Sequence, residues 1–289
     1  MTRVLLRPLL AFALISVSMA PAQPAAAQLT LGLRAGTATP YVWRGITRAN
    51  GLILQPEGYL AVRYHQTVLS AGVWGAYETG SRSPGNLSDL GSDRPGFSEL
   101  NYWTQATHRF RGLDVFAGVI RYDYRGRGPL AVKPSGASTT EVYGGLQKLT
   151  PYIVPKLTVY GDIDAVKGTY LEGSVTLPLL AVPVGNPIVF YFTALMGYNL
   201  GQERNAGDPS QRATFASEGF THSDLSLSGS FVLSRRLGAT LTLTPHLQFK
   251  IDDATRRTSP EPGDLRRNQQ FWLAASFAVS PVIAGWNGR

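Results

Sequence analysis

Residues 239–252 read ATLTLTPHLQFKID, a run in which apolar and polar side chains alternate. One parity is apolar and the other polar: Leu241, Leu243, Leu247, Phe249 and Ile251 against Thr240, Thr242, Thr244, His246, Gln248, Lys250 and Asp252. Successive side chains of a β-strand point to opposite faces, so this run predicts a strand with one apolar and one polar face. Similar runs recur about a dozen times with no helical pattern between them, which is typical of a transmembrane β-barrel.

The connections between the predicted strands fall into a tight set and a long set. The strands are expected at residues 29–47, 53–65, 68–78, 97–110, 113–124, 139–148, 152–163, 169–179, 188–200, 218–234, 239–252 and 268–280. Every second connection, counting from the one after strand 53–65, is tight. The long connections all belong to the other set, at 79–96, 125–138, 201–217 and 253–267. Outer-membrane barrels have an even number of strands, short periplasmic turns and long external loops. We therefore expect an all-β, antiparallel, up-and-down transmembrane barrel of about twelve strands with both chain ends in the periplasm.

Two places leave the strand assignment open. Asn50-Gly51 is a strong hairpin signal and is expected to turn the first strand into the second. At the other end, Phe277 lies in the last convincing strand, and twelve more residues, including Trp286, follow it to Arg289. A count of ten or fourteen strands therefore stays open, as does the role of the tail after Ser280.

The first 27 residues have the features of a secretory signal peptide. Arg3 and Arg7 precede an apolar stretch, and Ala25-Ala26-Ala27 provides a small-residue cleavage site. The apolar stretch is too short to span a bilayer as a helix. We expect cleavage after residue 27, so that residues 28–289 form one outer-membrane barrel of a Gram-negative bacterium.

The composition favours a membrane barrel over a water-soluble globule. Charged residues make up only 16% of the chain, below the usual share of about a quarter. The net charge of +8 falls to +6 when Arg3 and Arg7 are removed, and no nucleic-acid-binding motif or dense basic run is present. The expected partners are outer-membrane lipid, lipopolysaccharide, small polar solutes and the barrel-assembly machinery, with no nucleic acid. The chain has no cysteine and therefore no disulfide, and its oligomeric state is open.

In a membrane barrel the apolar parity faces lipid and the polar parity faces the lumen. The charged residues expected to line the lumen are Arg34, Arg63, Glu141, Lys156, Asp162, Asp164, Glu172, Asp224 and Lys250. Both signs occur, so ion pairs could cross-link a narrow lumen. Aromatic residues near strand ends are expected to form the girdles at the two interfaces: Tyr41, Trp43, Tyr77, Tyr122, Tyr124, Tyr152 and Tyr198.

Catalysis is not indicated by the nucleophiles and histidines. His222 and Ser223 are neighbours in a strand, so they point to opposite faces and cannot act together. His222, Asp224 and Ser226 share the polar face, which we interpret as lumen lining. The other histidines are scattered, and no metal-ligand spacing or phosphate-binding loop is present, so we expect no enzyme, no metal and no cofactor.

Several blocks resemble a proteobacterial family of outer-membrane porins, the TorF-like group. The most specific is Tyr41-Val42-Trp43-Arg44-Gly45-Ile46-Thr47, followed by Gly72-Val73-Trp74-Gly75-Ala76. Further matches occur in order along the chain, at Glu99–Tyr102, Tyr122–Tyr124, Thr140–Gly144 and Gly197–Asn199. The resemblance implies an outer-membrane barrel with a channel role and supplies no substrate. For Arg44 two interpretations stay open: a charge held by surrounding aromatic rings, or a residue that contacts the solute.

The leading functional hypothesis is therefore a porin-like channel for passive diffusion of small polar or charged solutes. The first alternative is a non-conducting barrel with a structural or partner-binding role, because about twelve strands leave little free lumen once large side chains fill it. A lipid-modifying hydrolase is the remaining alternative, and it would need a Ser–His pair on one face.

Overall fold

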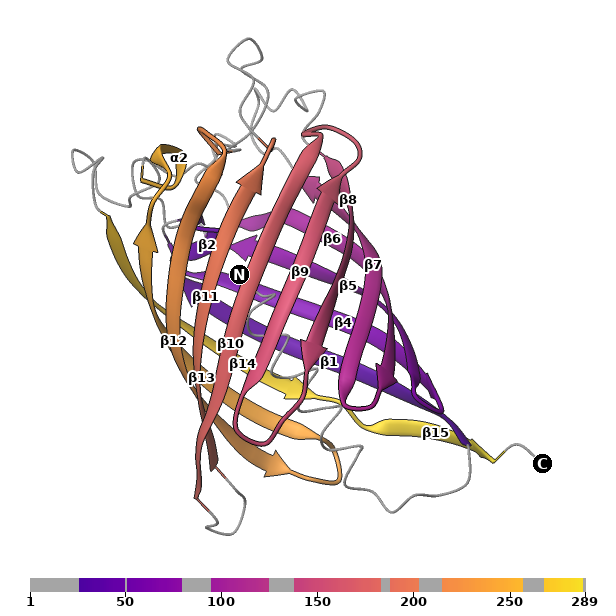
Figure 1. Ribbon diagram of the computed structural model, residues 1–289. Helices are drawn as coiled ribbons and strands as arrows, with labels where there is room; N and C mark the ends of the chain where they lie inside the picture. Colours follow the sequence, from indigo (N-terminus) through magenta and orange to yellow (C-terminus); the bar gives the residue numbers. More distant parts are fainter. Residues whose placement is uncertain are drawn as a thin grey trace.

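The computed structural model describes residues 26–49, 51–79, 95–124, 138–182, 188–202, 215–256 and 268–287. Within them, antiparallel strands close into a barrel of twelve, which confirms the predicted fold and strand number (Figure 1). The barrel strands are β1 (Ala26–Thr39), β4 (Ile53–Tyr64), β5 (Thr67–Glu78), β6 (Gly96–Phe110), β7 (Leu113–Tyr124), β8 (Thr139–Lys148), β9 (Val154–Asp162), β10 (Gly168–Val182), β11 (Ile188–Leu200), β12 (Gly219–Ser234), β13 (Ala239–Lys250) and β14 (Gln269–Val279). Each strand pairs with its neighbours in sequence order, and β14 closes the barrel against β1.

The outer surface of the barrel is apolar. Leu60, Leu157 and Leu243, each near the middle of a strand, are 50%, 49% and 42% exposed. The neighbouring positions on the other parity, such as Thr158 and Thr242, are buried inside the barrel. An apolar outside and a polar inside is the reverse of a soluble barrel and fits a surface that contacts hydrocarbon. The protein is thus a β-barrel of the bacterial outer membrane.

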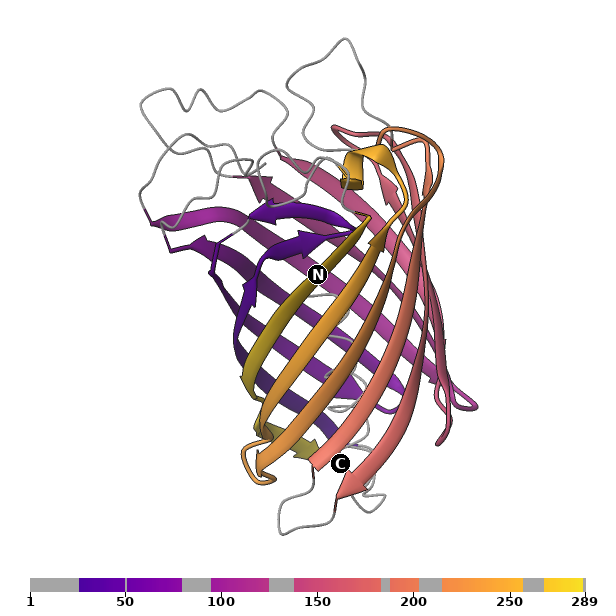
Figure 2. The ribbon, with the colours of Figure 1, turned by 90° about the vertical axis from the view of Figure 1, so that its left-hand side faces the viewer.

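The two ends of the barrel differ, as predicted. Tight turns such as Arg111-Gly112 lie at one end, and the strand ends that the long connections join lie at the other (Figures 1 and 2). The connection after β13 begins with a single helical turn, α2 (Asp253–Arg256), which the sequence pattern did not predict. No helix in the described part of the chain is long and apolar enough to cross a membrane. Most of each long connection, and residues 1–25 of the predicted signal peptide, lie outside the described residues.

The segment after Ser280 belongs to the barrel wall. It forms β15 (Val282–Asn287), which pairs with the first residues of β1, from Thr30↔Val282 to Ala26↔Asn287. Further along β1 the partner is β14, from Leu33↔Val279 to Thr39↔Leu273. β14 and β15 are therefore two halves of one closing strand, interrupted at Ser280-Pro281 because proline has no N–H to donate to the ladder.

The predicted first strand, residues 29–47, is too long. β1 ends at Thr39, and the chain then forms a separate hairpin of β2 (Tyr41–Trp43) and β3 (Ile46–Ala49). The hairpin turn falls at Arg44-Gly45, where φ is +48° and +86°, and not at the predicted Asn50-Gly51. Two consecutive positive φ values are what a two-residue type I′ turn requires. Asn50 itself lies outside the described residues.

Candidate functional site

The β2–β3 hairpin leaves the wall between β1 and β4 and lies inside the barrel (Figure 2). Near its base, Val42 and Ala49 are buried in a cluster with Ile53 of β4, Trp74 of β5 and Trp272 of β14. Ile53, Trp74 and Trp272 belong to wall strands on either side of the point where the hairpin leaves the wall. The base of the hairpin is therefore held by apolar packing against the near wall.

The other end of the hairpin reaches the far wall. Ile46 is buried against Tyr160 of β9, Tyr170 of β10 and Phe215. Gly45 lies against His222 of β12 so closely that a Cβ on the glycine would be 2.8 Å from the His222 Cγ. The hairpin therefore crosses the lumen from one wall to the other.

Polar contacts also hold the hairpin on both sides. The Tyr41 hydroxyl donates to Glu99 Oε2 of β6 at 3.1 Å, and the Thr47 hydroxyl donates to Gln270 Oε1 of β14 at 3.0 Å. In the described part of the chain the hairpin pairs with no wall strand in a backbone ladder, so side-chain contacts with the wall contribute to its position.

Arg44, at the tip of the hairpin, makes the strongest of these contacts. Its Nη1 and Nη2 donate to the two carboxylate oxygens of Glu141 on β8, at 2.7 and 2.8 Å. Each of the two side chains is only 3% exposed. This is the two-pronged arginine–carboxylate geometry, in which a planar guanidinium matches a planar carboxylate.

Aromatic rings surround the same guanidinium. The Arg44 Cζ lies 4.6 Å from the ring centroid of Trp43, 4.4 Å from that of Tyr160 and 4.3 Å from that of Tyr170. At these separations the ring faces attract a cation. The geometry agrees with the first interpretation of Arg44, a charge held by surrounding aromatic rings.

Two further wall residues complete the site. Glu141 also accepts hydrogen bonds from the Tyr122 hydroxyl at 2.8 Å and from Gln202 Nε2 at 3.2 Å. Gln202 Oε1 in turn accepts from Arg44 Nη1 at 3.3 Å. We call the wall residues around the guanidinium the arginine box: Tyr122, Glu141, Tyr160, Tyr170 and Gln202.

The arginine box lies near the end of the barrel that carries the long connections. Tyr122 and Tyr160 are each the third residue from the end of their strands, β7 and β9. Glu141 and Tyr170 are each the third residue from the start of β8 and β10. Adjacent strands run in opposite directions, so these four positions meet at one level of the wall.

The predicted lumen-lining charges lie on the inner parity of the strands, apart from one. Buried there are Arg34, Glu141, Asp162, Glu172, Asp224 and Lys250, and half-buried are Arg63 and Lys156. The exception is Asp164, which lies in the exposed connection after β9, paired with Arg121, because β9 ends at Asp162. The inner charges do not converge on one site. Arg34 pairs with Glu57 at 2.8 Å, and the Lys156 ammonium lies 4.5 Å from the ring centroid of Phe116.

His222, Asp224 and Ser226 are all buried on the inner face of β12, as the parity indicates. Asp224 Oδ1 pairs with His246 of β13, whose Nδ1 lies 2.8 Å away, whereas the His222 Nδ1 pairs with the Thr221 hydroxyl at 3.0 Å. The His246 ring is stacked on Trp272 at a centroid separation of 3.4 Å. In the described part of the chain, no group of three or more His, Asp or Glu side chains is placed to hold a metal ion.

Three of the aromatic residues predicted for the interface girdles lie inside the barrel. Tyr41 and Trp43 belong to the hairpin, which the sequence pattern placed in the wall, and Tyr122 of β7 contacts Trp43 from the wall. Tyr152 is 82% exposed at the tight-turn end, Tyr77 packs on Phe97, and Tyr198 packs on Phe220. The side chain of Tyr124 lies outside the described part of the chain.

Sequence reasoning missed Gln202, Tyr160 and Tyr170 as parts of the site. One signal for the hairpin was present. Arg44-Gly45 is the same dipeptide as Arg111-Gly112, which was predicted as a tight turn, and the two have similar geometry, with φ of +48° and +76° in the second.

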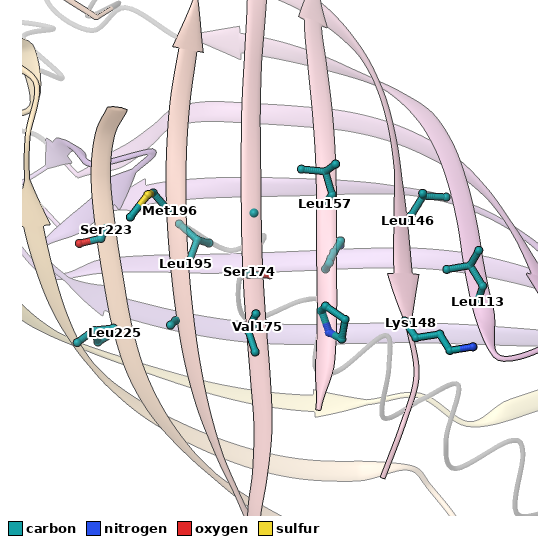
Figure 3. A pocket seen from close by; sticks show the side chains of 14 residues that line it. Leu113, Leu146, Lys148, Leu157, Ser174, Val175, Leu195, Met196, Ser223 and Leu225 are labelled. Atoms are coloured by element: carbon teal, nitrogen blue, oxygen red, sulfur yellow. The ribbon is translucent and has the colours of Figure 1, made fainter. Parts of the chain in front are cut away.

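A groove also lies on the outer face of the barrel, across β7 to β12 (Figure 3). It has a volume of about 730 Å³ and is lined mainly by apolar side chains such as Leu157, Val175 and Met196. Gly173 and Ala194 provide its floor with little side-chain bulk. This groove belongs to the surface that contacts lipid.

No family model and no curated protein matches the sequence. Among solved structures, the chain is similar to the KdgM porin, with 9% identity over 90% of this chain and 99% of that chain and a TM-score of 0.40. It is similar to the outer membrane phospholipase A from Escherichia coli, with 13% identity over 89% and 94% and a TM-score of 0.40. It is also similar to the CymD monoaromatic hydrocarbon channel, with 11% identity over 90% and 89% and a TM-score of 0.40. At these values the likeness assigns no activity to this chain.

Proposed function

We propose that the protein is an outer-membrane channel for the passive diffusion of small polar or charged solutes, with the β2–β3 hairpin as its narrowest point. The observation that carries the proposal is the hairpin itself, which lies across a polar lumen and contacts walls on opposite sides. The likeness of residues 41–47 to the TorF-like porin group supports the same proposal.

The size of the barrel makes an internal hairpin decisive for conduction. Barrels of about eight strands are filled by their own side chains, whereas those of 16–18 strands leave an aqueous channel. A twelve-stranded barrel lies between these limits. The width left beside the hairpin therefore determines which solutes pass.

A non-conducting barrel is the second candidate, and the contacts of Arg44 with the far wall favour it. A buried two-pronged ion pair and two wall tyrosine rings hold the tip of the hairpin at the far wall, as a permanent plug would require. We do not propose the third candidate, a lipid hydrolase. The Asp224–His246 pair is buried on the lumen side, away from the lipid-facing surface.

The two candidates differ in the conductance of a barrel without its hairpin. Replacing residues 40–51 with Asn-Gly removes the hairpin and lets a two-residue turn join β1 to β4. The strand register is preserved, because Ala38 already pairs with Ile53.

In a planar bilayer the proposal predicts discrete conductance steps for the mature protein and steps several times larger for the hairpin-deleted barrel. A silent mature protein with a conducting deleted barrel would favour the permanent plug. If both proteins fold, as shown by heat-modifiable migration, and both are silent, the channel proposal is wrong.

A further inference from the structure

We propose that the arginine box is a binding site for guanidinium groups, that Arg44 is its tethered occupant, and that a small solute carrying a guanidinium group competes with Arg44 for it. The binding part of this inference stands on the geometry of the wall. Its consequence for transport, release of the hairpin by the solute, rests on the proposed channel function.

The wall residues of the box also contact one another. Tyr122 and Gln202 both donate to Glu141, so the carboxylate keeps two wall donors when Arg44 leaves. The tyrosine rings are held in a row of wall aromatics, with Tyr143–Tyr160 centroids 5.7 Å apart, Tyr160–Tyr170 6.1 Å apart and Tyr170–Phe215 5.5 Å apart. A site held in this way keeps its shape when its occupant leaves.

The chemistry of the box selects a planar cation. Two carboxylate oxygens accept parallel N–H bonds from Arg44, which an ammonium ion cannot supply in that geometry. The two tyrosine faces add attraction for a flat, weakly hydrated cation. The expected ligand class is therefore a small guanidinium compound rather than an amine.

The occupant is strained in a way that a free ligand would not be. Arg44 has φ +48°, in the left-handed region where residues other than glycine and asparagine are disfavoured. The hairpin that carries it has only three residue pairs and no ladder to the wall, and short isolated hairpins are marginally stable.

The fit of the hairpin is also incomplete on the side of β13 and β14. Buried there without a hydrogen-bond partner are His246 Nε2, Gln248 Oε1 and Trp272 Nε1. These residues line a cavity of about 30 Å³ beside Trp43 and Gly45, with room for about one water molecule. Release of the hairpin opens this cavity to solvent, and hydration of these atoms offsets part of the free energy lost with the hairpin contacts.

The test begins by emptying the box while keeping the turn. Arg44→Asn removes the guanidinium, and asparagine tolerates the left-handed conformation. The matched control is Arg111→Asn, which makes the same change in the same Arg-Gly turn at the exposed tight-turn end. Heat-modifiable migration on gels checks that both variants fold. If Arg44→Asn does not fold, the hairpin-deleted barrel is used in its place as the protein with an unoccupied arginine box.

Binding is measured by calorimetry in detergent with methylguanidinium chloride, against methylammonium chloride as the comparison cation. We expect Arg44→Asn to bind methylguanidinium with a dissociation constant of about a millimolar, roughly tenfold tighter than Arg111→Asn or the unaltered protein. Adding Glu141→Gln to Arg44→Asn should abolish that gain, and methylammonium should bind at least about tenfold more weakly.

Methylguanidinium binding that is no tighter in Arg44→Asn than in Arg111→Asn, or that survives Glu141→Gln, would overturn the inference. The channel proposal is judged separately, in the bilayer. If the barrel binds methylguanidinium but does not conduct, the channel proposal is wrong and the binding site stands. If it conducts but does not bind methylguanidinium, the channel proposal stands and the binding site is wrong.

Discussion

At Arg44 a buried charge and a strained backbone occur in the same residue. Its side chain is 3% exposed, its guanidinium is hydrogen-bonded to Glu141, and its φ of +48° lies in the left-handed region. A buried ion pair is no guarantee of stability, because removing two charges from water is costly. We infer that the Arg44–Glu141 ion pair positions the tip of the hairpin against the wall.

Glu141→Gln should release the hairpin without disturbing the barrel. Leaving Arg44 buried without its counter-charge costs roughly 3–5 kcal/mol, more than a short hairpin can supply. Hydrogen exchange of the Tyr41–Ala49 amides, followed by mass spectrometry, should therefore accelerate while the wall strands stay protected. The matched control is Asp114→Asn, which breaks the Arg109–Asp114 pair near the tight-turn end and should leave hairpin exchange unchanged. Equal protection of the hairpin in Glu141→Gln and in the unaltered protein would contradict this.

Gly45→Ala should destabilise the hairpin more than Gly112→Ala destabilises its turn. Both positions have positive φ, so each substitution carries roughly 1–2 kcal/mol of backbone strain. A Cβ at Gly45 would also lie 2.8 Å from His222 Cγ, whereas the nearest atom at Gly112 is 3.7 Å away. Adding His222→Ala should recover only the part of the clash due to the imidazole ring, because the Cβ of residue 222 would still lie 2.9 Å away. Thermal unfolding of the three variants measures the difference, and identical losses at the two glycines would show that the hairpin tip does not touch β12.

At the scale of the strands, the alternation of side chains predicted the wall closely. The predicted bounds 113–124, 139–148 and 188–200 match β7, β8 and β11 at both ends. Alternation could not separate β1 from the hairpin, because β2 and β3, of three and four residues, are too short to show a period. The pattern indicates which face of a strand is apolar. It does not indicate whether the strand lies in the wall or inside the barrel.

The site was predictable only in part for the same reason. Glu141 and Arg44 were both singled out, one as lumen lining and the other as a charge among aromatic rings. The two residues are 97 positions apart in the sequence, and their pairing depends on a hairpin that folds inward. Tyr160 and Tyr170 carry no local signal, because tyrosine is common in any strand.

The final strand gives a prediction at this scale. Removing residues 281–289 deletes β15 and leaves the Ala26–Thr30 segment of β1 without its partner on that side. An open edge in a membrane barrel exposes backbone groups that lipid cannot satisfy. We expect the truncated protein to lose its heat-modifiable, folded migration on gels. Removing only residues 288–289 is the control and should have no effect, and a truncated barrel that folds as efficiently as this control would contradict the assignment of β15 to the wall.

At the scale of the whole barrel, the lumen charges differ between the two ends. Acidic side chains predominate near the hairpin, at Glu57, Glu99, Glu141, Glu172 and Asp224. Basic side chains predominate near the tight turns, at Arg63, Arg109 and Lys156. Arg44 and Arg48 of the hairpin bring positive charge to the acidic end.

Deleting the hairpin should therefore shift the ion preference of the channel towards cations. The replacement of residues 40–51 removes Arg44 and Arg48 and leaves the acidic wall in contact with the solution. The reversal potential in a potassium chloride gradient measures this preference. An unchanged reversal potential, or a shift towards anions, would show that the hairpin arginines do not offset the wall charge.

The outer surface gives a second prediction for the whole molecule. Leu243→Arg, in the middle of β13, should destabilise the barrel by roughly 2–4 kcal/mol, because an arginine at the bilayer midplane is not solvated. Leu237→Arg, in the turn before β13, should cost about 0–1 kcal/mol at the interface. Both leucines are exposed, 42% and 50%, so burial alone does not distinguish them. Urea unfolding in lipid vesicles measures both, and equal costs would contradict the membrane placement.

The most direct measurement is a disulfide between the hairpin tip and the far wall. The chain has no cysteine, so Gly45→Cys with His222→Cys introduces the only two thiols. A Cβ on Gly45 would lie 2.9 Å from the His222 Cβ, and a small outward shift reaches the spacing of about 3.5–4.5 Å that a disulfide needs. If the hairpin crosses the lumen, mild oxidation of the folded protein gives an intramolecular disulfide in this pair and none in the control pair Gly112→Cys with His222→Cys. Two free thiols in the oxidised Gly45→Cys/His222→Cys protein, in a barrel shown to be folded, would contradict a hairpin that spans the lumen.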